Sequence, residues 1–128
     1  METTYSLLPE LHVVSNEDYV LNRTPSRFYY EALEDSSFFS IEQGVLQGII
    51  ANNREMEGKR LVMLHKQLYA AKERIDSFVL LSPLERYQEF VRKYPSLNNR
   101  VPDKYIANVL GITPVSLSRI RKRIASAT

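Results

Sequence analysis

The chain has 128 residues, a net charge of +2 and no cysteine. The absence of cysteine excludes disulfide bonds, thiolate metal sites and cysteine-bound iron–sulfur clusters. No apolar run approaches the roughly 20 residues that a membrane-spanning helix needs. The first residues lack the positive start and apolar stretch of a secretory signal, so we expect a cytoplasmic protein without a membrane partner.

Charge is distributed unevenly along the chain. Residues 1–57 contain ten acidic and three basic side chains, whereas residues 58–128 contain five acidic and fourteen basic ones. This polarity is typical of a protein whose C-terminal part faces a polyanion while its N-terminal part has another role.

The N-terminal part predicts a short β-hairpin. Residues 11–14 fit a short strand, the aromatic-rich residues 28–32 fit a second, and residues 37–41 fit a third. A turn at 34–36 pairs the last two strands. Because a lone hairpin is marginal in water, we expect a helix or a partner chain to cover its apolar face.

The middle of the chain predicts two helices, a short one over 42–52 and a long one over 54–78, separated at Asn52 and Asn53. In the long helix, apolar side chains alternate three and four residues apart, which is an a/d heptad pattern. This pattern fits either a core helix packed on the hairpin or a seam that pairs with its twin in a parallel dimer. We favour the dimer, because the rest of the chain offers too little apolar surface to cover the helix. The predicted seam residues are Leu61, Leu64, Leu68, Ala71, Ile75 and Phe78.

The C-terminal third predicts three helices, over about 83–94, 102–110 and 114–125. Ser82 is the expected N-cap of the first, with Glu85 completing a capping box. Pro95 is expected to end this helix, and residues 95–102 to form a loop.

A sharp turn is expected between the last two helices. Gly111 suits the left-handed C-cap of one helix, while Thr113 and Pro114 suit the N-cap and first position of the next. The small Ala107 allows the two helices to cross closely, which is the helix-turn-helix plan. The second helix is expected to turn three apolar side chains inward: Leu117, Ile120 and Ile124.

The outward face of this last helix indicates DNA binding. The start of a recognition helix reaches base edges, and an arginine such as Arg119 can pair with both O6 and N7 of guanine. The alternative is a solvated basic face on an ordinary helical hairpin; the glycine turn and the apolar spacing favour DNA binding. The predicted base-reading residues are Val115, Ser116 and Arg119. The predicted phosphate contacts are Thr113, Ser118, Lys122, Arg123, Arg100 and Lys104.

Residues 100–107, 110–114 and 117–122 resemble the DNA-binding end of Crp/Fnr-type bacterial transcription regulators, in the form that has no β-hairpin wing after the recognition helix. Residues 25–28 and 31–35 resemble the final strands of that family's cyclic-nucleotide-binding β-roll. The resemblance implies a homodimer on a palindromic operator, RNA polymerase as a further partner, and a truncated sensor part.

The chain departs from the family at the ligand site. Family members that bind cyclic AMP use a Gly-Glu pair ahead of an Arg-Ser pair, and here Pro25 stands at the arginine position before Ser26. Arg27 is one residue out of place, so its side chain is expected on the other side of the strand. Without the charged partner of the phosphate, we predict no cyclic nucleotide and no cofactor.

Other chemistry finds no support in the sequence. His12 and His65 lack zinc-ligand spacing, and no catalytic triad or phosphate-loop pattern occurs, so we predict neither a metal site nor an enzyme.

The predicted fold is α+β, mainly α, with an effector segment at 1–53, a dimerisation helix and hinge at 54–81 and a helix-turn-helix domain at 82–128. The predicted function is a sequence-specific, dimeric transcription regulator of Crp/Fnr type. Two alternatives stay open: a dimerisation or protein-interaction module that does not bind DNA, and a small-ligand sensor.

Overall fold

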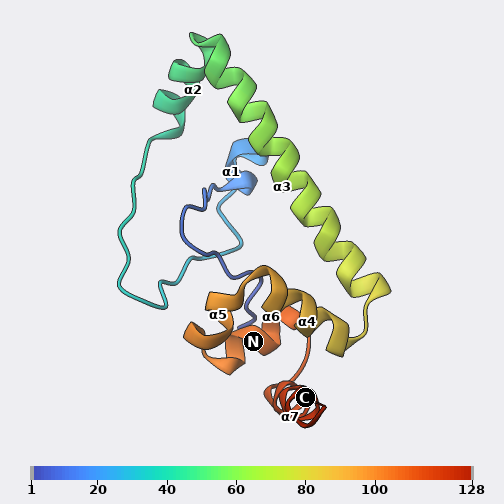
Figure 1. The fold of residues 1–128 in the computed structure, drawn as a ribbon. Coiled ribbons are helices and arrows are strands. Elements are labelled where there is room, and N and C mark those ends of the chain that lie inside the picture. The colour runs from blue at the N-terminus through green and yellow to red at the C-terminus, as the bar shows by residue number, and fades with distance from the viewer. Residues whose placement is uncertain (1, 128) are drawn as a thin grey trace. The chain divides into compact units, whose positions relative to one another are not determined.

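A computed structural model describes residues 2–127, which form seven α-helices and no β-strand. The chain divides into two compact units, one made of Met1–Asp35 and Pro83–Thr128, the other of Ser36–Ser82. Figure 1 labels the helices of both units. The prediction of a mainly helical protein is therefore confirmed. Within residues 2–127, every helix is either too short or too polar to span a lipid bilayer.

The unit Ser36–Ser82 contains two helices that pack against each other, α2 (Gln43–Ala51) and α3 (Arg54–Leu80). Between them, the side chain of Asn53 accepts hydrogen bonds from the backbone N–H groups of Glu55 and Met56 and so caps α3. The predicted break at Asn52 and Asn53 and the long helix after it are both confirmed.

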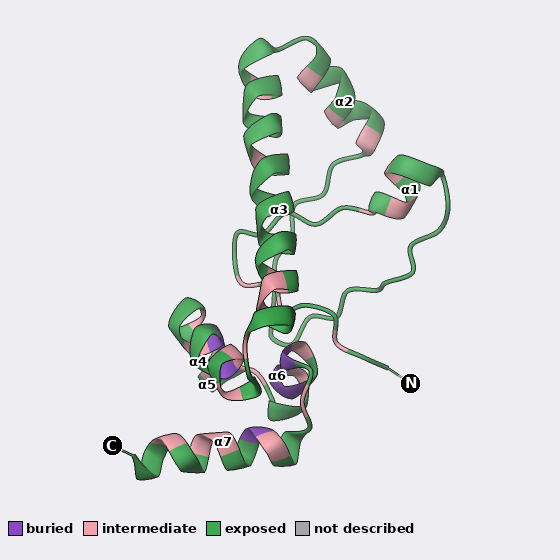
Figure 2. Cartoon of the chain, turned by 90° about the vertical axis from the view of Figure 1, so that its right-hand side faces the viewer, coloured by how far each residue is buried: buried purple, intermediate pink, exposed green. Residues whose placement is uncertain are grey.

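The other unit contains four helices in its C-terminal part: α4 (Pro83–Lys93), α5 (Pro95–Arg100), α6 (Asp103–Leu110) and α7 (Pro114–Ser126). Their apolar faces meet in one core, and Figure 2 shows buried residues on α4, α6 and the start of α7. The core consists of Tyr87, Phe90, Leu97, Ile106, Ala107, Leu110 and Leu117.

The short helix α5 corrects the prediction of a loop at 95–102. Pro95 does stop α4, but it also occupies the first turn of α5, where a proline has no N–H to lose and its fixed φ suits a helix. Leu97 of α5 is buried in the core, so this single turn and a half is held by packing. The bundle has four helices rather than the three expected.

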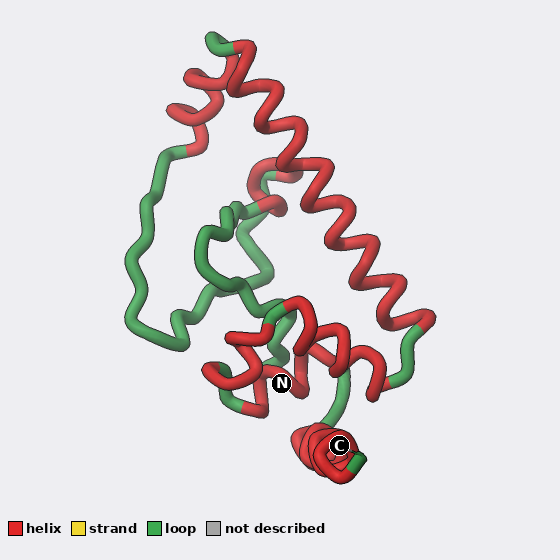
Figure 3. Tube along the Cα trace, in the orientation of Figure 1, coloured by secondary structure: helices red, strands yellow, loops and turns green. Residues whose placement is uncertain are grey.

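The predicted β-hairpin is wrong, and so is the strand at 11–14. Residues 24–42 contain neither helix nor strand (Figure 3), and Phe38 and Phe39 are 76% and 108% exposed. A two-stranded hairpin needs an apolar surface or a third strand to lie on, and among the described residues no further strand exists to pair with it. The β-propensity of the aromatic residues is thus overridden by the lack of a partner.

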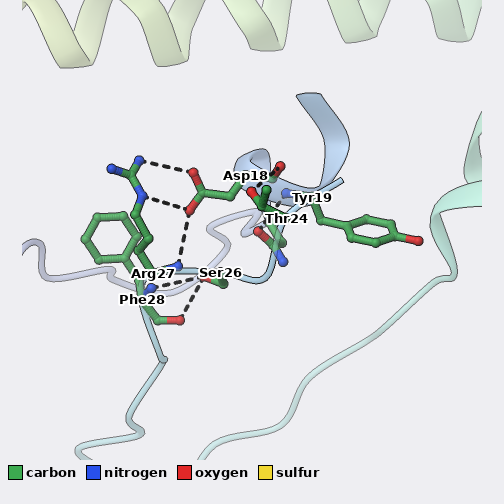
Figure 4. A network of polar contacts seen from close by, with 7 residues as sticks. Asp18, Tyr19, Thr24, Ser26, Arg27 and Phe28 are labelled. Atoms are coloured by element: carbon green, nitrogen blue, oxygen red, sulfur yellow. Dashed lines mark hydrogen bonds and ion pairs between the residues drawn. The ribbon is translucent and has the colours of Figure 1, made fainter. Parts of the chain in front are cut away.

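The N-terminal residues instead form a helix that the sequence pattern does not predict, α1 (Glu17–Asn22), followed by a turn fixed by polar contacts (Figure 4). The Asp18 carboxylate accepts hydrogen bonds from the backbone N and the Nε of Arg27, both at 3.2 Å. These bonds lower the pKa of Asp18 and raise that of Arg27. The Ser26 hydroxyl donates to the carbonyl of Phe28 at 2.8 Å.

Candidate nucleic-acid interface

The turn between α6 and α7 has the expected caps. Gly111 lies in the left-handed region at φ 67° and ψ 35°, and the N–H of Ile112 donates to the carbonyl of Ala107 at 3.0 Å. The Thr113 hydroxyl accepts from the N–H of Ser116 at 3.1 Å, and Pro114 begins α7. The cap predictions at Gly111, Thr113 and Pro114 are therefore confirmed.

One side of α7 is held in the core. Leu117 is fully buried, and Ile120 and Ile124 pack against the same cluster. Ala107, also fully buried, lies on α6 in this cluster, where a small side chain permits close packing of the helices. The inward face of the helix is as predicted, and it fixes which side chains point away from the bundle.

The opposite side of α7 carries an exposed cationic stripe. Its members recur three and four residues apart and so lie on one helical face. Within the described residues, none of its three cations takes part in an ion pair. The stripe consists of Val115, Ser118, Arg119, Lys122 and Arg123.

Two of the predicted DNA contacts on this helix are engaged in its cap. Ser116 is partly buried, and its hydroxyl lies 3.0 Å from the hydroxyl of Thr113. Thr113 also accepts from the backbone of Ser116. Both hydroxyls therefore stabilise the N-terminus of α7. The first backbone N–H groups of a helix have no partner within the helix, and this cap satisfies one of them.

Arg121, for which the sequence pattern predicts no role, joins α7 to three other helices. Its Nε donates to the hydroxyl of Tyr87 at 3.1 Å, its Nη1 to Asp103 at 2.6 Å and its Nη2 to the side-chain oxygen of Asn98 at 3.1 Å. Partial burial lowers the pKa of Arg121, but the bonds to Asp103 and Tyr87 outweigh it and leave the pKa above its ordinary value. Arg121 therefore stabilises the bundle, although it lies between stripe residues in the sequence.

The predicted phosphate contacts on α5 and α6, Arg100 and Lys104, are also engaged. Arg100 donates to Glu10 at 2.6 Å and to Glu34 through both Nε and Nη2. The bonds raise the pKa of Arg100 and hold the pKa of each glutamate below its ordinary value. The ammonium of Lys104 lies 4.5 Å from the centre of the Tyr105 ring. Among residues 2–127, the predicted contacts that have no other polar partner therefore lie on the α7 stripe.

The predicted dimer seam lies on α3, in the other unit. All six of its residues are exposed, among them Leu68 at 70% and Ile75 at 63%. The guanidinium of Arg74 lies 5.2 Å from the centre of the Phe78 ring, so part of the seam carries a cation over it. An apolar stripe at heptad spacing is thus left facing solvent.

Within residues 2–127, no group of three or more His, Asp or Glu side chains could hold a metal ion. Comparisons of this chain with the models of protein families, with curated proteins and with solved structures give no match. The features of the molecule that bear on function are therefore the stripe of α7 and the exposed face of α3.

Proposed function

We propose that this protein binds double-stranded DNA in a sequence-specific manner, with α6 and α7 as a helix-turn-helix, and that it acts as a homodimeric transcription regulator of the Crp/Fnr type. One observation carries the proposal. The apolar side of α7 is fixed in a core, and the opposite side presents Arg119, Lys122 and Arg123 with no acidic partner in the described residues.

The chemistry of the stripe suits a major groove. Arg119 is exposed in the first half of α7, where it can pair with O6 and N7 of guanine, and the exposed Val115 can contact a thymine methyl group. Lys122 and Arg123 lie one turn further on, where a recognition helix leaves the base edges and meets phosphates. Ser116 contributes less than the sequence pattern predicts, because its hydroxyl is engaged by Thr113.

A homodimer follows from the same requirement for specificity. One recognition helix contacts only a few base pairs, whereas two helices held one turn of DNA apart, roughly 34 Å, read a palindrome. The exposed heptad stripe of α3 is the surface that would join the two copies.

The test is a titration of duplex DNA, first selected from a random pool, at several salt concentrations. We expect an inverted repeat, and a logarithm of affinity that falls linearly with the logarithm of salt, by about 0.9 for each phosphate neutralised. Arg119→Ala should weaken binding by about 1–3 kcal/mol per half-site and relax the sequence preference at one position.

Arg92→Ala is the matched control. Arg92 is an exposed cation of α4 that pairs with Glu89, so its removal changes the net charge by the same amount without touching α7. If both variants weaken binding equally, the attraction is diffuse and the recognition role of α7 is wrong.

A second candidate is a dimerisation module that does not bind DNA. The observation in its favour is the exposed stripe of α3, which needs no DNA to explain it. It predicts a dimer whose behaviour is unchanged by any duplex in the selected pool.

A further inference from the structure

The N-terminal residues 2–35 form an acidic segment that belongs to the same compact unit as the four-helix bundle. They contain seven acidic and two basic side chains, whereas residues 83–127 contain three acidic and nine basic ones. We call residues 2–35 the acidic arm. Its charge is opposite to that of the bundle it accompanies.

Two ion pairs, one apolar contact and one hydrogen bond attach the acidic arm to the bundle. Glu10 and Glu34, which are 24 positions apart in the sequence, meet on the single guanidinium of Arg100. Leu7 packs against the apolar core. The hydroxyl of Tyr105 donates to Glu31 at 3.4 Å. The polar contacts fall on Arg100 of α5, which is itself a predicted phosphate contact, and on Tyr105 of α6, which follows the predicted contact Lys104 in the sequence.

The acidic arm also has internal contacts that hold its two ends together. The rings of Tyr5 and Phe28 lie 5.0 Å apart, and the hydroxyl of Tyr29 donates to Glu2 at 2.8 Å. The hydroxyl of Tyr30 donates to the carbonyl of Ser15 at 3.1 Å. Glu10 and Glu34 therefore reach Arg100 from two stretches that are linked to each other.

A guanidinium binds carboxylate and phosphate through the same pair of parallel N–H groups. From this geometry we propose that the acidic arm occupies Arg100 in place of a DNA phosphate, and that DNA must displace it to gain that contact. The inference rests on the proposed function, because the competitor of the arm for Arg100 is DNA. The attachment of the arm itself can be tested without DNA. The α7 stripe stays uncovered by the arm's ion pairs, so the arm tunes affinity rather than abolishing it.

The attachment is tested first, with a spin label on a single cysteine. The chain has no native cysteine, so His12→Cys, at an exposed arm position beside Glu10, carries the only label. Relaxation of backbone amides is then followed by NMR. We expect the label to broaden amides of residues 95–110, and Glu10→Gln with Glu34→Gln to remove most of that broadening. No broadening, or broadening that the double variant leaves unchanged, overturns the proposal.

The competition is tested next, by the affinity of the selected duplex. Glu10→Gln with Glu34→Gln should bind about threefold to fivefold more tightly, the size of a released surface ion pair, and its salt slope should steepen by about 0.9 for one added phosphate. Arg100→Ala should then weaken binding in this background and have little effect in the native one. The matched control is Glu17→Gln with Asp35→Asn, which removes two charges from the arm but no ion pair to the bundle.

The outcomes separate the two proposals. Equal affinities for the native protein and the Glu10→Gln, Glu34→Gln variant overturn the competition, as does an equal gain in the control, which would show general repulsion. If no variant binds any duplex although the label shows the arm attached, the proposed function fails and the competition fails with it, while the attachment stands.

Discussion

Two arginines of α7, two positions apart, illustrate how the same side chain takes different roles. Arg119 lies on the exposed stripe, and Arg121 turns toward Tyr87, Asn98 and Asp103. Since positions two apart on a helix lie on nearly opposite sides, only one of them can face solvent here. The basic run 119–123 therefore combines one structural cation, Arg121, with exposed cations that belong to the proposed interface.

Replacement of Arg121 tests the structural role. Arg121→Met keeps most of the aliphatic stem but removes all three hydrogen bonds and leaves the partly buried oxygen of Asn98 without its cation. We expect a loss of about 1–2 kcal/mol in the free energy of unfolding, measured by urea unfolding with circular dichroism at 222 nm. Arg119→Met is the control and should change stability by less than about 0.5 kcal/mol. Equal losses would contradict the assignment.

The sequence could not have assigned Arg121 or Arg100 to these roles. Their partners lie far along the chain: Tyr87 and Asp103 for Arg121, and Glu10 and Glu34 for Arg100. Side-chain ion pairs of this kind depend on tertiary packing, which leaves no periodic signal in the sequence. By contrast, the spacing of Leu117, Ile120 and Ile124 predicts directly which face of α7 is buried, and that prediction is confirmed.

Helix ends follow the opposite rule, because their determinants are local. The bonds at the Gly111 and Thr113 caps span at most five positions, so the sequence pattern suffices to place these caps. The cap at Asn53 is equally local, although the pattern predicts only a break there. The β-hairpin fails for the converse reason: its stability depends on a surface that the local pattern cannot supply. Pro95 is an intermediate case, since a proline both ends one helix and begins the next.

Gly111 provides the test for the α6–α7 turn. Its φ of 67° strains any residue with a Cβ, so Gly111→Ala should destabilise α6 and α7 by about 1 kcal/mol. Gly58→Ala in α3 is the matched control and should stabilise its helix instead. An added Cβ there meets nothing within 4 Å, and alanine favours a helix interior over glycine. Amide hydrogen exchange reports the two units separately. Unchanged protection in α7 of Gly111→Ala would contradict the role of the turn.

The proposed assembly of two chains would depend on α3, whose 27 residues form the longest helix described and whose predicted seam is exposed. Exposure of Leu61, Leu64 and Leu68 in a monomer is unfavourable, because full burial of each large apolar side chain stabilises a protein by about 1.5–3 kcal/mol. Heptad spacing adds a geometric reason, since it keeps one stripe against a partner over several turns. The stripe therefore supports self-association, and dimerisation would double the recognition surface of α7.

Leu68→Glu tests this assembly at the centre of the seam. We expect the native chain to be a dimer in sedimentation equilibrium and Leu68→Glu to be a monomer, because two acidic side chains would face each other in an apolar interface. The same variant should lose at least tenfold in affinity for the inverted repeat while keeping its weaker binding to one half-site, since α7 is untouched. Val62→Glu, an apolar-to-acidic change at another exposed position of α3 that lies off the seam, should stay dimeric. If the native chain is a monomer, or if Leu68→Glu is still a dimer, α3 is not the dimer interface. In that case the proposed dimer on an inverted repeat is contradicted.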